Sequence, residues 1–218
     1  MVTTPTKSII NTWVSATWDE YLENIDNPIY QKAKGYYYNK EYRIEMTPIG
    51  NDHSQDHSII NHAVYLYATL KGIPLNGKDN CSYRKTGVFE IQPDLSCYIG
   101  DNANAIPWGT GIIDLNQYPA PNLVIEVANS SLADDLGQKR LLYEDLGIAE
   151  YWIIDVQNVK VIAFKIVNNG SQRIKESQVL PGLEIAILTE ALQRSRKSNH
   201  TEVGAWLLQE FQTSKNNS

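Results

Sequence analysis

Residues 123–128 read Leu-Val-Ile-Glu-Val-Ala, an apolar segment rich in β-branched residues that contains a single carboxylate, Glu126. A continuous apolar run of this length is typical of a strand that is buried on both faces of a sheet. An ionisable side chain inside such a strand is rarely there for packing, because a buried charge is costly unless it is paired. Glu126 is therefore the first candidate for a functional residue.

A lysine follows this strand at a position that faces the protein interior. The segment 134–146 is predicted to form one helix, and Lys139 lies in the middle of its apolar stripe. The lysine could extend past the stripe to water, or it could pair with Asp135 one turn earlier. In a third interpretation, its partner is the carboxylate of Glu126 on the neighbouring strand.

A second carboxylate precedes another apolar run. Pro93 and Asp94 are followed by residues 95–99, which read Leu-Ser-Cys-Tyr-Ile and predict a strand. Proline at a strand entrance is ordinary and an aspartate there can simply cap a turn, so this pair alone is weak evidence. Combined with Glu126 and Lys139, it predicts two anions and one cation that meet in a common pocket.

These segments resemble the Uma2-like (DUF820) family of the PD-(D/E)XK restriction-endonuclease-like superfamily, over about residues 17–190. The matching segments are 43–53, 92–94, 123–127, 135–143 and 147–155. The most specific of them is the Glu-Tyr-Trp sequence that follows a glycine-ended helix. The resemblance implies an α/β (mixed α+β) fold with a restriction-endonuclease-like core, in which a twisted mixed β-sheet is flanked by helices.

The resemblance also implies the roles of individual residues. Asp94 and Glu126 would be catalytic carboxylates that bind Mg²⁺ or Mn²⁺ together with the backbone carbonyl of Val127, since hard cations prefer oxygen ligands. The lysine of the superfamily motif would fall two residues after the glutamate, where this sequence has Ala128. Lys139 on the following helix would replace it as the third catalytic residue. The implied activity is metal-dependent hydrolysis of DNA phosphodiester bonds by an endodeoxyribonuclease.

Two other functions are consistent with the same residues. The chain could be a catalytically inactive nuclease-fold module that binds DNA or a protein partner, or the charged groups could form an ion network in a structural oligomer. The intact set Asp94, Glu126 and Lys139 favours the enzyme, because an inactive copy gains nothing from a costly buried lysine. The resemblance implies DNA as the substrate. A homodimer is expected because two sites related by a two-fold axis can cut both strands.

Three further residues, Glu45, His53 and Asp135, are candidates for lining the cleft or supporting the site. Glu45 is equally well explained as a surface residue of a predicted strand, and Asp135 would hold the catalytic lysine. His53 and His57 have the spacing of metal ligands on a helix, but no nearby glutamate completes a hydrolase motif. His53 is also expected to precede the helix predicted over 56–71, so a zinc site is not favoured.

Composition limits the remaining classes of function. The chain has 218 residues, 42% of them hydrophobic, and a net charge of −6, which indicates one soluble domain and argues against broad non-specific binding of nucleic acid. Candidates for a local basic surface are residues 84–85, 139–140 and 194–197. No signal peptide is expected in residues 1–16, which lack a continuous apolar core and a basic start, and no apolar run reaches about 18 residues, so no membrane partner is expected. Cys81 and Cys97 are expected to be reduced core residues, which favours a bacterial cytoplasmic location.

The predicted organisation is an N-terminal extension over residues 1–16, a PD-(D/E)XK nuclease-like domain over 17–190, and a C-terminal helix with a disordered tail over 191–218. Within it, strands are predicted near 36–38, 42–46, 80–84, 88–99, 122–128, 150–155, 160–167 and 177–187. Helices are predicted near 17–23, 56–71, 134–146 and 201–211, and a long loop over 100–121.

Overall fold

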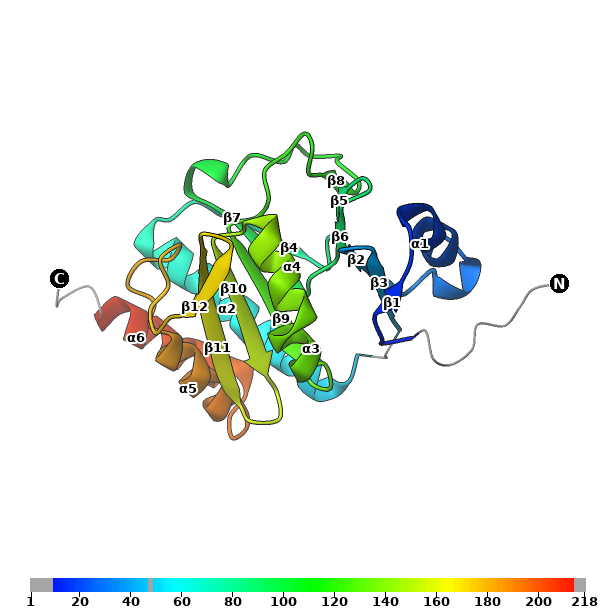
Figure 1. The fold of residues 1–218 in the computed structure, drawn as a ribbon. Helices are drawn as coiled ribbons and strands as arrows, with labels where there is room; N and C mark the ends of the chain where they lie inside the picture. The colour runs from blue at the N-terminus through cyan, green and yellow to red at the C-terminus, as the bar shows by residue number, and fades with distance from the viewer. Residues whose placement is uncertain (1–9, 47–48, 214–218) are drawn as a thin grey trace.

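A computed structural model of the chain describes residues 10–46 and 49–213. They form two six-stranded sheets that lie side by side, here named sheet A and sheet B (Figure 1). Sheet A has the order β1 (Val14–Ser15), β3 (Glu41–Glu45), β2 (Lys34–Tyr38), β6 (Phe89–Ile91), β5 (Tyr83–Lys85), β8 (Ile113–Asp114). Sheet B has the order β12 (Gly170–Arg173), β11 (Lys160–Val167), β10 (Glu150–Asp155), β9 (Leu123–Ala128), β7 (Leu95–Ile99), β4 (Leu75–Asp79).

The six helices of the described residues pack against the two sheets, the first against sheet A and the other five against the two faces of sheet B. They are α1 (Trp18–Ile25), α2 (Asn51–Lys71), α3 (Leu132–Leu136), α4 (Gln138–Leu146), α5 (Ile185–Ser195) and α6 (His200–Thr213), with short 3₁₀ turns at Pro28–Tyr30 and Gly100–Asn102. One face of sheet B packs against α2, α5 and α6, and the other against α4 and sheet A. The mixed α/β fold is thus confirmed, although the sequence predicted one sheet and the structure has two.

Strand pairing in sheet B places the predicted carboxylates side by side. β9 runs parallel to β10 and antiparallel to β7, with Leu95 opposite Ile125. Asp94 immediately precedes β7, so it lies beside Glu126 at the same end of the sheet. Because side chains alternate along a strand, Glu126 shares the face of Val124 and Ala128, which α4 covers. This face also turns towards sheet A.

The strand predicted over 88–99 is wrong as a single element. It is divided into β6 and β7, which belong to different sheets. The division falls at Gln92–Pro93, and proline cannot donate a ladder hydrogen bond. The chain therefore crosses between the sheets just before Asp94.

Three other predicted elements need correction. The helix over 134–146 is two helices, because Gly137 has a non-helical backbone with φ −104° and ψ −108°. The strands over 177–187 are replaced by an isolated bridge between Glu176 and Glu184 and by α5. The loop over 100–121 contains a 3₁₀ turn and β8, and the polar strand β4 was not predicted.

The boundary expected at residue 190 falls inside α5. α6 packs in the same core as α2 and α5, through Val203, Leu207 and Phe211. Of the N-terminal extension, residues 14–15 form β1 beside β3. Gln212 and Thr213, expected in the disordered tail, belong to α6. Residues 1–9, 47–48 and 214–218 lie outside the described part of the chain, so the remaining predictions for these segments stay predictions.

Two expectations about partners and redox state can be compared with the structure. None of the helices in residues 10–46 and 49–213 has the length and apolar character needed to span a bilayer. Cys81 and Cys97 are free, as expected, but only Cys97 lies in a strand and is buried.

Candidate active site

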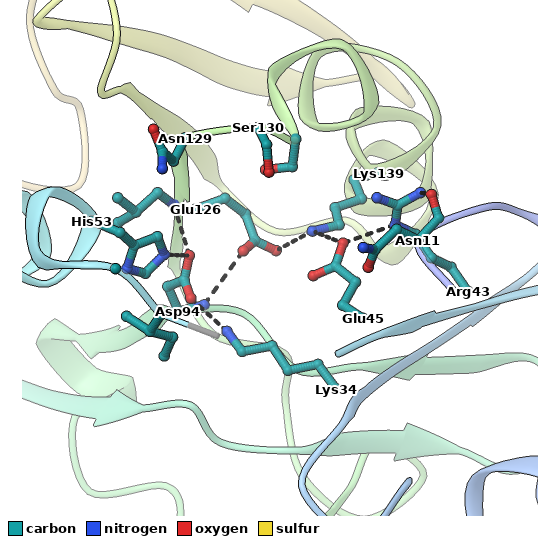
Figure 2. A pocket seen from close by; sticks show the side chains of 14 residues that line it. Asn11, Lys34, Arg43, Glu45, His53, Asp94, Glu126, Asn129, Ser130 and Lys139 are labelled. Carbon is teal, nitrogen blue, oxygen red and sulfur yellow. Dashed lines mark hydrogen bonds and ion pairs between the residues drawn. The ribbon is translucent and has the colours of Figure 1, made fainter. Parts of the chain in front are cut away.

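The predicted residues meet in a pocket of about 350 Å³ between the two sheets (Figure 2). Asp94, Glu126 and Lys139 line it, and so do Glu45 and His53. These side chains come from both sheets, from α2 and from α4, so the pocket is assembled from segments far apart in the sequence.

The two carboxylates are held at a fixed spacing by the backbone. Oδ2 of Asp94 accepts a hydrogen bond from the amide of Val127 at 2.7 Å. The amide of Asp94 in turn donates to Oε2 of Glu126 at 3.4 Å. Both carboxylates are buried, with exposed fractions of 5% and 2%. β9 supplies one acid and one amide, and Asp94 just before β7 supplies the other acid and the other amide, so the backbone of these two segments positions both carboxylates.

Glu126 is held by a neutral donor on its other oxygen, because Oε1 accepts from the hydroxyl of Tyr143 at 2.7 Å. The hydroxyl of Tyr36 lies 3.2 Å from the same oxygen, but its single proton has a closer acceptor in the carbonyl of Gln92 at 2.8 Å. Burial and the charge of Asp94 together raise the pKa of Glu126 to about 8, although the charge of Lys139 opposes them. This carboxyl therefore takes up a proton more readily than an exposed glutamate does.

Lys139 is buried among three carboxylates. Its Nζ lies 3.0 Å from Glu45, 3.1 Å from Asp135 and 3.8 Å from Glu126, and 4.3 Å from the centre of the Tyr36 ring. Burial alone would lower the pKa of the ammonium, but the three carboxylates outweigh it and raise the pKa well above the usual value. Lys139 is therefore a fixed positive charge, and the interpretation in which it extends to water is wrong.

His53 lines the pocket, as the sequence predicted, but its place in the secondary structure differs from the prediction. α2 begins at Asn51, so His53 belongs to the helix and does not precede it. Its Nε2 is 3.4 Å from Oδ2 of Asp94, whereas His57 Nε2 is 3.1 Å from Asp79. The two rings serve different carboxylates, which does not support a zinc site.

Sequence reasoning missed two cations from sheet A. Lys34 on β2 forms an ion pair with Asp94, and Arg43 on β3 lies 2.8 Å from Glu45. Burial would raise the pKa of Asp94, but the hydrogen bond from His53 and the charge of Lys34 hold it well below the usual range. β3 carries charged residues at alternate positions, a pattern that also fits a solvated hairpin, and Lys34 is the only charged residue of β2. Lys34 and Arg43 reach the pocket because they belong to a second sheet that faces it, and the sequence did not predict this sheet.

The donor set fits a hard divalent cation. Within the described residues, no group of three or more His, Cys, Asp and Glu side chains is placed to hold a metal. Asp94 and Glu126 offer two carboxylates, and a hard cation can take its remaining ligands from a backbone carbonyl and water. Burial is the main cause of the raised pKa of Glu126, and a bound cation would favour the ionised form of this carboxyl.

Comparison with known families agrees with this geometry. The sequence profile of the Uma2 family, described as "Putative restriction endonuclease", matches residues 18–203. The chain belongs to the Uma2 family. A solved structure described as a putative nuclease belonging to DUF820, from Anabaena variabilis, matches with a TM-score of 0.53 and 17% identity, over 88% of this chain and 99% of that one. At this identity, the likeness establishes the fold alone. No curated protein matches the chain.

The basic segments of this Uma2 protein are partly neutralised. Each of the three candidates for a local basic surface has an arginine in an ion pair with a carboxylate: Arg84 with Glu90, Arg140 with Glu144, and Arg196 with Asp56. Lys139 of the second candidate segment does face the pocket, together with Lys34 and Arg43 of sheet A, which the sequence analysis did not single out.

Proposed function

We propose that this Uma2 protein is a metal-dependent endodeoxyribonuclease that hydrolyses DNA phosphodiester bonds. The observation that carries the proposal is the meeting of Asp94, Glu126 and Lys139 in one pocket between the sheets. Asp94 and Glu126, with the carbonyl of Val127, would hold Mg²⁺ or Mn²⁺. The description of the family as a restriction endonuclease supports DNA as the substrate.

The residues around the cation would divide the chemistry among them. When bound, the cation would supply Lewis-acid polarisation of the scissile phosphate. The hydroxyl of Tyr143 holds one oxygen of Glu126, which leaves Oε2 directed towards Asp94. Asp94 is ionised because its pKa is depressed, so it offers a negative oxygen at any physiological pH.

Lys139 acts through its charge in this proposal. Since its pKa is raised well above the usual value, it is a poor general base. A buried ammonium beside the pocket can stabilise the negative charge that develops on the phosphate, or orient the attacking water. Glu45 and Asp135 hold it within 3.1 Å, so the charge is in place before the substrate arrives.

The test is cleavage of plasmid and single-stranded DNA with Mg²⁺ or Mn²⁺, comparing the wild type with Glu126→Gln. Metal-dependent cleavage that is lost in the variant is the expected result. A wild type that binds DNA without cutting it under any metal would favour the inactive module. A metal titration without any binding would instead favour an ion network in a structural oligomer.

We also propose that the protein acts as a homodimer in the bacterial cytoplasm. One pocket holds one set of acids and so cuts one strand at a time, whereas a two-fold dimer presents two pockets to a duplex. The free cysteines support a reducing compartment. Sedimentation of the purified protein, together with the ratio of nicked to linear plasmid, tests the assembly.

A further inference from the structure

Lys34 and the backbone hold Asp94 from opposite sides. Oδ2 of the carboxylate accepts from the Val127 amide at 2.7 Å and lies 3.4 Å from Nε2 of His53. Oδ1 is paired with the ammonium of Lys34, which reaches across from sheet A (Figure 2). The orientation of the carboxylate is therefore set through Oδ2, and the ion pair with Lys34 is an addition to it.

The two lysines of the pocket differ in how firmly they are held. Lys139 has a side-chain exposure of 2% and three carboxylates within 3.8 Å, so its ammonium has no other place to go. The Lys34 side chain is 17% exposed and, among the described residues, its ion pair is with Asp94 alone. A lysine at the first position of a strand, on a flexible four-carbon stem, can leave its partner by rotation of the side chain.

The carboxylate oxygens that a cation could contact in this pocket lie at or beside the ion pair of Lys34 with Asp94. Oε1 of Glu126 is taken by the hydroxyl of Tyr143 at 2.7 Å, while Oε2 has the amide of Asp94 at the longer distance of 3.4 Å. This leaves Oε2 of Glu126 and Oδ1 of Asp94 as the pair of oxygens that a divalent cation could bridge. An ammonium and a divalent cation cannot share Oδ1 at contact distance, because like charges repel.

We propose that Lys34 is an exchangeable counter-ion of Asp94, which a divalent cation displaces and which then contacts a phosphate of the bound DNA. The inference rests on the proposed function, because it requires a cation between the two carboxylates. The double charge of the cation favours the exchange. The released ammonium remains in a pocket of about 350 Å³, where a phosphate would offer it a new negative partner.

A fixed structural role for Lys34 predicts the opposite result for metal binding. If Lys34 were needed to keep Asp94 in place, its removal would disorder a metal ligand and weaken the binding of the cation. If Lys34 competes with the cation, its removal strengthens the binding. The sign of the change therefore separates the two roles.

The experiment is a calorimetric titration of Mn²⁺ into the wild type, Lys34→Met, Lys34→Arg and Lys32→Met. We expect Lys34→Met to bind Mn²⁺ roughly tenfold more tightly, as for the loss of one competing ion pair. Lys34→Arg keeps the competing charge and should bind no more tightly than the wild type. Lys32, which is exposed two residues earlier, is the control for net charge and should leave the affinity unchanged.

A second measurement, the KM for DNA, tests the proposed contact between the released ammonium of Lys34 and a phosphate. At saturating Mn²⁺, Lys34→Met should raise the KM for DNA several-fold, because one phosphate contact is lost. Circular dichroism of each variant confirms that it is folded before the titrations are compared.

The outcomes separate this inference from the function on which it rests. An affinity for Mn²⁺ that is equal or weaker in Lys34→Met, in a wild type that binds Mn²⁺ and cleaves DNA, overturns the exchange and leaves the nuclease proposal intact. An unchanged KM overturns the phosphate contact. Absence of Mn²⁺ binding in both the wild type and Lys34→Met overturns both proposals.

Discussion

Two buried glutamates on neighbouring parallel strands are held in different ways. Glu150 at the start of β10 accepts from Trp152 Nε1 and Ser177 Oγ, each at 2.9 Å, and from the amides of Gln178 and Val179. All four donors are neutral. Glu126 on β9 instead shares its surroundings with a second acid and a lysine, and it lines a pocket.

The difference shows that burial of a carboxylate does not by itself indicate function. Neutral donors fix Glu150 against the core that α2, α5 and α6 cover, and its contacts explain its presence completely. Glu126 faces the other side of sheet B, where its pKa is raised to about 8. A group that has a strongly shifted pKa and lies beside a cavity and other charges is a candidate for a catalytic or binding residue.

The largest expected effect is on cleavage by Glu126→Gln. The amide keeps the size of the side chain but removes the charge that would bind a cation. Loss of several kcal/mol of transition-state stabilisation corresponds to a rate roughly 10³-fold lower. Plasmid cleavage under single-turnover conditions measures it.

Glu150→Gln is the matched control, because it makes the same chemical change in a buried glutamate of the adjacent strand. We expect its cleavage rate to stay close to that of the wild type once folding is verified. If the cleavage rate of Glu150→Gln also fell a thousandfold, the loss in Glu126→Gln could be attributed to reduced stability and would not show a catalytic role.

Lys139→Met should remain folded and lose cleavage, on the order of 10²-fold or more. The thioether side chain fills the volume of the lysine, and Glu126 and Asp135 can take up protons when their shared cation is gone. Arg140→Met on the next position of α4 serves as the control, since Arg140 pairs with Glu144 away from the pocket. Wild-type cleavage by Lys139→Met would refute the assigned role.

Glu150→Ala tests whether Glu150 stabilises the fold. Removing the carboxylate leaves four donors without their acceptor, so the free energy of unfolding should fall by about 2–4 kcal/mol. Urea unfolding measures it. The exposed Glu184 provides the control, and Glu184→Ala should change stability by less than about 0.5 kcal/mol. Equal losses in the two variants would contradict the structural role of Glu150.

The smallest expected effect is on the pH dependence of metal binding. Because the pKa of Glu126 is raised to about 8, a cation must displace its proton at lower pH. The affinity for Mn²⁺ should therefore increase with pH, by up to about tenfold per unit, and level off above the pKa. Titrations in buffers of different ionisation enthalpy would detect the released proton. An affinity that does not change over this range would show that Glu126 binds no cation.

Local sequence patterns were sufficient to predict that the two acids of sheet B, Asp94 and Glu126, belong to the site. The apolar run around Glu126 and the proline before Asp94 predict strands wherever the rest of the chain lies. The inward position of Lys139 follows from helical periodicity, which survives the break at Gly137 because α4 contains the whole relevant turn.

The cations of sheet A could not be predicted, because their position depends on strand pairing between segments that are far apart in the sequence. Lys34 and Arg43 reach the site only because the hairpin that carries them joins β6 in a second sheet. Nothing in the sequence of the hairpin specifies that partner. α5 was missed for a local reason, since Pro181 and Gly182 favour a turn between strands. The helix begins only three residues later, at Ile185.

The crossing of the chain between the sheets has a consequence for the order of folding. The contact of Lys34 with Asp94 spans 60 residues of sequence, and Tyr36 meets Glu126 across 90. Contacts of this range form slowly, because a long loop must close before they contribute. In a refolding time course, the cores of the separate sheets can therefore form before the pocket exists, and enzymatic competence should be the last property to return.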